Sequence, residues 1–235
     1  MMWGEMQVII ASYHKTGTEL IRGIFKQYRL YDNTFDFQFN DHFNYVSNNK
    51  IKTSKCVVII RHPYELLMSA VRWHETDSKK NIPYWNEPQP RFNNLSYYEY
   101  FRAIKSFDEK ILFELSNSAG SNIKHMYNDI KHRNFNNNVL FIKLEDLWDK
   151  SNIPIVCKKI KHHFEYIERP KGLEIIQHDK LTKAFEVGLT INYHRTNFER
   201  TGMYTVNYKN CHTYAEYLKD IHYQRIEKIF PNDLL

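Results

Sequence analysis

Two short apolar runs near the start of the chain restrict the fold more than any other feature. Residues 7–12 (QVIIAS) and 56–60 (CVVII) consist almost entirely of buried-type side chains, which is typical of strands covered on both faces. Each run passes through a polar turn into a stretch with helical spacing, over residues 18–28 and 63–72. Strands that alternate with helices predict an α/β fold with a central parallel sheet flanked by helices.

The rest of the chain continues this alternation. Two further strands are predicted, over residues 34–39 (TFDFQF) and 138–146 (NVLFIKLED). Apolar residues at helical spacing predict four more helices, over residues 96–117, 121–132, 153–164 and 212–229.

Two segments lack a regular period. Residues 76–95 are polar and contain prolines, and we interpret them as a surface loop or lid. Residues 180–210 look mostly irregular and are predicted to form a loop. The chain as a whole, residues 1–235, is predicted to be one domain, since this length can bury a core of its own.

Charge and cysteine content limit the classes of partner. Lys and Arg number 33 against 27 Asp and Glu, and the net charge of +6 favours an anionic partner such as a nucleotide. The basic residues are scattered, so we do not expect nucleic acid to be the partner. The three cysteines show no metal-ligand spacing, and no metal is expected. With no membrane anchor or leader evident, we expect a cytoplasmic protein.

The turn at residues 13–18 (YHKTGT) has the residue types of a phosphate-binding loop. It joins a predicted strand to a helix N-terminus, where unpaired backbone N–H groups and the helix dipole favour an anion. Gly17 permits close backbone approach, Lys15 adds a positive charge, and Thr16 and Thr18 supply hydroxyls. An ordinary turn with Thr18 as the N-cap would explain the same residues without a ligand.

Two other segments have residues suited to a second phosphate. Arg61 follows the strand at 56–60, at the edge of the sheet where α/β proteins bind ligands, and Ser69 lies about two helical turns further on. A late segment, residues 198–202, reads FERTG. Taken singly, each is also explained by a surface arginine, a helical serine or an ordinary loop.

Together these segments resemble the soluble, cytosolic type of sulfotransferase that uses 3′-phosphoadenosine 5′-phosphosulfate (PAPS). The family's first motif is roughly YPKSGTxW, and residues 13–20 here read YHKTGTEL. Its second motif, Arg-x-Pro with a Ser eight residues after the Arg, is matched at residues 61–69. Its late F-x-R-K-G loop matches residues 198–202, and its Y-E-D turn resembles LED at residues 144–146. The matches follow the family's order along the chain.

The resemblance implies the P-loop-like sulfotransferase fold, PAPS as cofactor and its product adenosine 3′,5′-bisphosphate (PAP). It implies a cofactor site made of the first loop, the Arg-x-Pro element and the late loop: Lys15, Thr16, Gly17, Thr18, Glu19, Arg61, Ser69, Phe198, Arg200, Thr201 and Gly202.

The resemblance also implies the catalytic groups. The family places a His or Glu base after its second strand, a position that His42 holds here, with Asp41 as the reserve. Lys15 is expected to act on the leaving phosphate. Tyr84 and Trp85, in the segment 76–95, are candidate contacts for the acceptor.

Among the departures from the family pattern, four bear directly on the expected site. Leu20 replaces the Trp that stacks on adenine, and Leu144 replaces the Tyr of Y-E-D, so adenine must be held otherwise. Thr201 replaces a Lys, which removes one charge from the 3′-phosphate clamp. Asn40, two residues before His42, replaces a Lys that the soluble type of sulfotransferase has at this position.

The expected partner is a small-molecule or glycan acceptor that offers a hydroxyl or an amine. The family's dimer motif is only half matched, by Lys209 and Thr213, so we expect a monomer or a weak dimer. One alternative is a P-loop nucleotide kinase or NTPase, but that motif needs a Lys directly after its last Gly, and Thr18 follows Gly17. Another is a non-catalytic protein that binds nucleotide or nucleic acid.

Overall fold

The computed structural model describes residues 7–76, 83–132, 135, 137–165, 176–198 and 217–231. The chain divides into two compact units. Unit 1 comprises residues 1–62 and 129–208, and unit 2 comprises residues 63–128 and 209–235. A single domain over the whole chain stays a prediction.

Unit 1 contains a sheet of four parallel strands, so the predicted α/β architecture is confirmed. The strands lie in the order β2-β1-β3-β4. Their bounds are β1 Gln7–Ser12, β2 Gln38–Asn40, β3 Ser54–Ile60 and β4 Val139–Lys143. Because all four are parallel, their carboxyl ends meet at one edge of the sheet, where open α/β sheets bind ligands.

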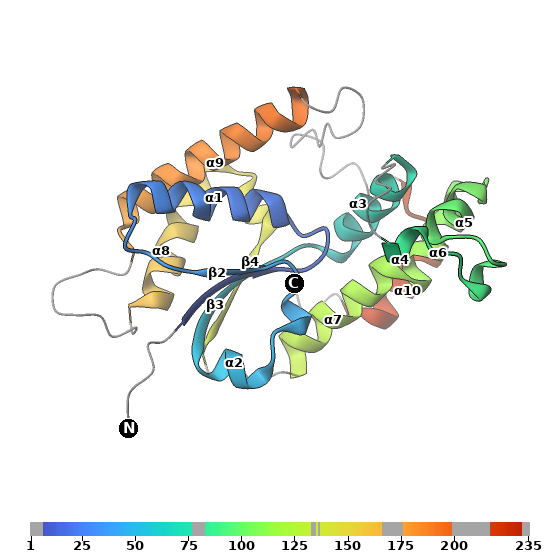
Figure 1. Ribbon diagram of the computed structural model, residues 1–235, viewed down its shortest axis with the longest axis horizontal. Coiled ribbons are helices and arrows are strands. Elements are labelled where there is room, and N and C mark those ends of the chain that lie inside the picture. Colours follow the sequence, from blue (N-terminus) through green and yellow to red (C-terminus); the bar gives the residue numbers. More distant parts are fainter. Residues whose placement is uncertain are drawn as a thin grey trace. The chain divides into compact units, whose positions relative to one another are not determined.

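The two central strands are apolar because helices cover both faces of the sheet. Ile10 of β1 and Ile59 of β3 belong to the core cluster that α1 (Thr18–Tyr31), α8 (Ile153–Phe164) and α9 (His178–Phe198) cover. Figure 1 shows these three helices on one face and the short helix α2, Asn48–Lys52, on the other. All seven residues of β3 are buried: the apolar run predicts this for residues 56–60, and the polar Ser54 and Lys55 are buried as well.

Helix α9 corrects the prediction that residues 180–210 are irregular. Residues 178–198 are helical, and residues 199–210 lie outside the described residues. The helix packs beside α1 (Figure 1), where Gly188 permits close approach: a Cβ there would meet Ile24 Cγ1 at 2.6 Å. The apolar spacing of residues 181, 184, 185 and 189 is helical, but the glycine between them obscures it.

Strand β2 is shorter than the alternation at residues 34–39 predicts. Pairing with β1 begins only at Gln38, opposite Ile9. The cause is a turn at Asp32, whose side chain accepts hydrogen bonds from the backbone N–H and hydroxyl of Thr34, at 3.1 and 2.6 Å. Phe35 is nevertheless fully buried, so the alternation correctly marks the face toward the core.

The described part of unit 2 is helical. Its helices are α3 Pro63–Thr76, α4 Pro83–Asn86, α5 Tyr97–Ala103, α6 Phe107–Ser116, α10 Asp220–Ile229 and most of α7 Ser118–His132. The single helix predicted over residues 96–117 is therefore wrong. Ser106 starts a new helix instead, and its side chain accepts a bond from Glu109 N. The segment predicted to be a loop, 76–95, contains α4 and a 3-10 helix, Pro90–Phe92, while residues 77–82 lie outside the description.

The core of unit 2 surrounds a buried polar pair. His74 Nδ1 is hydrogen-bonded to Glu114 Oε1, and Tyr97 donates to the same oxygen at 2.7 Å. Both side chains of the pair are fully buried. The rings of Trp85, Tyr97 and Tyr98 lie within 5.8 Å of the His74 ring. Burial and the neighbouring Glu114 carboxylate raise the pKa of Tyr97, so its hydroxyl stays protonated and donates.

We expect His163, on α8, to make unit 1 sensitive to acid. Burial, with a smaller contribution from Lys55, lowers the pKa of His163 from 6.5 to about 4. As the pH falls, His163 is therefore protonated in the unfolded chain before it is protonated in the folded protein. The free energy of unfolding that unit 1 has above about pH 6.5 decreases in consequence as the pH falls toward 4. The loss amounts to at most about 3 kcal/mol. Urea unfolding at pH 7.5 and 4.5 should show a smaller loss for His163→Gln than for wild type; equal losses would contradict this.

Candidate functional site at the carboxyl edge of the sheet

The loop after β1 is held in shape by its own buried groups. The Thr16 hydroxyl accepts a bond from Tyr13 N at 2.8 Å and lies within donating distance of the carbonyl oxygens of Tyr13 and Ile59, at 2.8 and 3.0 Å. Tyr13 is also fully buried and donates to Asp129 Oδ2 at 2.6 Å. Thr16 thus supports the loop from inside, and its predicted contact with a cofactor stays a prediction.

Two residues of this loop have left-handed backbone conformations. Gly17 has φ 86° and is the N-cap of α1, and Lys15 has φ 65°, which is uncommon for a residue with a side chain. Leu144 packs so closely that a Cβ on Gly17 would meet its Cδ1 at 2.7 Å. Left-handed residues in tight turns orient successive N–H groups to one side and form concavities that bind anions.

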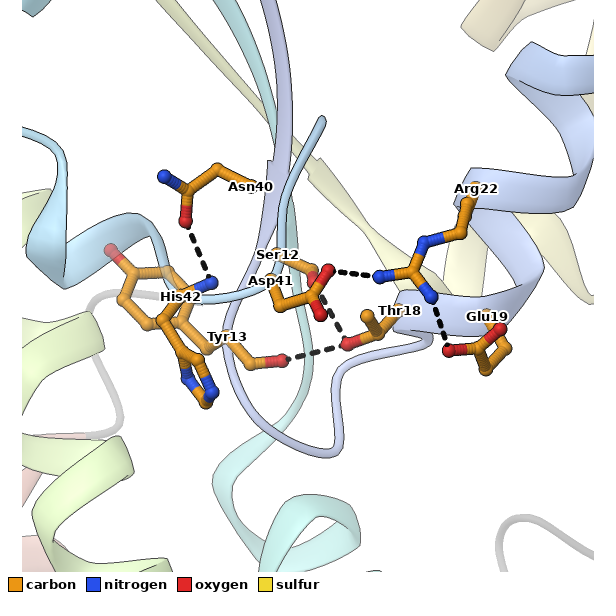
Figure 2. Close-up of polar contacts among 8 residues, drawn as sticks. All are labelled: Ser12, Tyr13, Thr18, Glu19, Arg22, Asn40, Asp41 and His42. Atoms are coloured by element: carbon orange, nitrogen blue, oxygen red, sulfur yellow. Dashed lines mark hydrogen bonds and ion pairs between the residues drawn. The ribbon is translucent and has the colours of Figure 1, made fainter. Parts of the chain in front are cut away.

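The start of α1 differs from an ordinary capped turn. Among the described residues no side chain caps this helix, and the N-cap is Gly17. The Thr18 hydroxyl lies 2.8 Å from Ser12 Oγ and 3.4 Å from the Tyr13 carbonyl oxygen instead (Figure 2). Thr18 is therefore not the N-cap that the ligand-free explanation of the loop requires. The first N–H groups of a helix have no partner within it, and these are left to a ligand or water.

Arg61 connects the end of β3 to this loop. Its side chain is only 5% exposed, and Nη1 donates to the carbonyl oxygen of Lys15 at 3.1 Å. The guanidinium also lies over the ring of Trp148, 5.8 Å from the centroid. Ser69, predicted to act with Arg61, lies on α3 in unit 2 and is half-buried, so their joint role stays a prediction.

His42 lies in the turn that follows β2. Its backbone N–H donates to Asn40 Oδ1 at 2.9 Å, and the neighbouring Asp41 is paired with Arg22 of α1 (Figure 2). Arg22 is also bonded to Glu19 at 2.8 Å. The candidate base is half-buried, and the reserve base already has a cationic partner.

A second imidazole lies beside the candidate base, which sequence reasoning missed. The rings of His14 and His42 are stacked, with centroids 6.0 Å apart and planes 20° apart. The exposed ring of Tyr45 contacts His42 at 5.6 Å. The sequence feature that could have pointed to this second imidazole is His14 itself, which stands where the first motif of the resembled family has proline.

The turn after β4 contributes structural contacts at the same edge. Glu145 Oε1 accepts a bond from His62 N at 3.0 Å, which fixes the backbone next to Arg61. Burial, aided by the charge of Lys143, lowers the pKa of His62, so this imidazole is neutral at neutral pH.

The remaining predicted residues lie elsewhere or outside the description. Trp85 of α4 packs against Tyr97 at 4.3 Å within unit 2, and the side chain of Tyr84 is not among those described. Phe198 ends α9, but its side chain lies outside the described residues, as do Arg200, Thr201 and Gly202 in full.

The described residues contain no group of three or more His, Cys, Asp or Glu side chains placed to hold a metal ion. None of their helices has the length and apolar character needed to cross a membrane.

Comparison with known proteins gives no relative: no protein-family model matches the chain, and no curated protein matches it.

Proposed function

We propose that this protein is a PAPS-dependent sulfotransferase that moves a sulfonate to a hydroxyl or amine of an acceptor. The observation that carries the proposal is the loop between β1 and α1, with Lys15 and Gly17 in left-handed conformations and no side-chain cap on the helix. Arg61 binds this loop, and His42 follows the neighbouring strand. The motif resemblance in the sequence supplies the donor.

The described residues fit a donor with several negative charges. An uncapped helix N-terminus, Lys15 and the buried Arg61 bring positive charge and N–H groups to one edge of the sheet. The lysine comes before the glycine, unlike in the nucleotide P-loop, where it follows. This order favours PAPS over ATP as the ligand of the loop.

Each residue has a defined part in the transfer. When bound, PAPS supplies a sulfonate activated by its bond to a phosphate leaving group. Lys15 and the amides of Thr18 and Glu19 would hold the 5′-phosphate and would stabilise the negative charge that this leaving group gains. His42 accepts the proton from the acceptor oxygen or nitrogen as that atom bonds to sulfur. The imidazole then releases this proton to solvent.

Arg61→Ala should weaken binding of adenosine 3′,5′-bisphosphate by roughly 10- to 100-fold, the loss expected for one charge-assisted phosphate contact. Binding of 5′-AMP, which lacks the 3′-phosphate, should change by less than about 3-fold. Arg61→Lys should show an intermediate loss of bisphosphate affinity, because lysine keeps the positive charge but cannot donate the two parallel hydrogen bonds of a guanidinium. Calorimetric titration measures all of these affinities. Equal losses for both ligands would show that Arg61 acts only through the Lys15 carbonyl and would contradict a 3′-phosphate role.

A further inference from the structure

Trp148 lies at the carboxyl edge of the sheet, directly after the short 3-10 helix Leu144–Leu147 that follows β4. Its backbone N–H donates to the Glu145 carbonyl oxygen at 3.1 Å, which fixes the position of the residue. The ring is half-buried, and its inner part packs against the hydrophobic core of unit 1. Part of a large aromatic surface is thus exposed at the edge that carries the loop and Arg61.

The indole is not explained by packing alone. Its Nε1 is buried and has no hydrogen-bond partner among the described residues. Burying an N–H without a partner costs free energy, and such a group calls for an explanation beyond core filling. A phenylalanine or leucine would fill the same space without this cost. An indole offers in exchange a wider and more electron-rich face for stacking.

Arg61 links this ring to the loop. One side-chain nitrogen of Arg61 donates to the Lys15 carbonyl oxygen at 3.1 Å, and the guanidinium lies 5.8 Å from the Trp148 ring centroid. A ligand whose phosphates bind the loop and Arg61 therefore lies within reach of the indole.

The two positions at which leucine replaces an aromatic residue of the family motifs cannot serve a base here. Leu20 is 6% exposed and belongs to the core cluster, and Leu144 is 5% exposed and packs against Gly17. Both side chains are turned into the protein, whereas Trp148 keeps part of its ring at the surface.

We propose that Trp148 is the stacking platform for the purine base of an adenine nucleotide bound at this edge. The proposal rests on the proposed function for the identity of the nucleotide, but the stacking role holds for any adenine nucleotide whose phosphate binds the loop. Stacking on an aromatic side chain tolerates different bases and depends on ring area, so the size of the ring determines the affinity.

The test combines tryptophan fluorescence with calorimetry on the full chain, using adenosine 3′,5′-bisphosphate, 5′-AMP and ribose 5-phosphate as ligands. The bisphosphate should quench the fluorescence of the wild type, and Trp148→Phe should lose this quenching. Trp148→Leu should bind the bisphosphate about 5- to 100-fold more weakly, while its affinity for base-free ribose 5-phosphate stays that of the wild type. Trp73→Phe, which alters a buried indole of unit 2, is the matched control and should keep the quenching.

The outcomes separate the two proposals. If 5′-AMP binds with quenching that depends on Trp148 and the bisphosphate does not bind, the platform stands and the proposed donor is wrong. If the bisphosphate binds Trp148→Leu as tightly as the wild type, the platform is wrong and the donor stands. If no adenine nucleotide binds, both proposals are overturned.

Discussion

Replacing Glu114 by alanine is expected to destabilise the protein by about 3–5 kcal/mol, the cost of breaking a buried polar pair by removing one partner. The Glu114 side chain is fully buried, is hydrogen-bonded to His74 Nδ1 and accepts a bond from the Tyr97 hydroxyl. Alanine leaves both of these groups without their partner in an aromatic interior and adds a cavity. Urea unfolding followed by circular dichroism measures the change in the free energy of unfolding.

Two matched variants identify the cause. Glu114→Gln keeps an oxygen of the same reach and should lose less stability than Glu114→Ala. Glu109→Ala, on the exposed side of the same helix, should stay within about 0.5 kcal/mol of the wild type. A loss below about 1 kcal/mol for Glu114→Ala would show that the pair does not stabilise the helical unit.

His42→Ala is expected to slow sulfonate transfer by about 10²–10⁴-fold, which is the usual contribution of a positioned base. Binding of adenosine 3′,5′-bisphosphate should change far less than the transfer rate, because the proposed role of His42 is to take the proton of the acceptor, and its described contact with the loop is the stacking on His14. The rate is measured with labelled PAPS and an acceptor found by screening phenols, alcohols, sugars and amines.

Two other variants separate the base from its neighbours. Asp41→Ala should retain more activity than His42→Ala, because Asp41 is paired with Arg22. His162 of α8 is 68% exposed and is bonded to Glu165, which follows the helix; His162→Ala should therefore match the wild type. Full transfer activity in His42→Ala together with a large loss in Asp41→Ala would assign the base to Asp41.

Strong local patterns made much of unit 1 predictable. The apolar runs at residues 7–12 and 56–60 correspond to β1 and β3, and the helix predicted over 153–164 is α8. Such runs cannot form an exposed helix or loop without leaving apolar surface in water, so local and overall preferences agree.

The incorrect predictions arise where a single side chain or a distant contact decides the structure. The Asp32 turn delays β2, and Gly188 serves the contact with α1 but weakens the helical signal of α9. His74 and Glu114 lie 40 positions apart, so no local pattern predicts that they pair.

The candidate site, like the fold, could be predicted from the sequence only in part. Residue types and spacing predict the loop, because Lys15, Gly17 and Thr18 lie close together in the sequence. The contact between Arg61 and the Lys15 carbonyl, and the stacking of His14 on His42, depend on which strands are neighbours in the sheet. Only the fold supplies that information.

Calorimetric titration of the wild-type protein with adenosine 3′,5′-bisphosphate, PAPS and ATP tests the central claim most directly. The bisphosphate and PAPS should bind at least about 10-fold more tightly than ATP, since each offers the 3′-phosphate that ATP lacks. Tight binding of ATP with no binding of the bisphosphate would contradict the account and indicate a nucleotide kinase or NTPase instead.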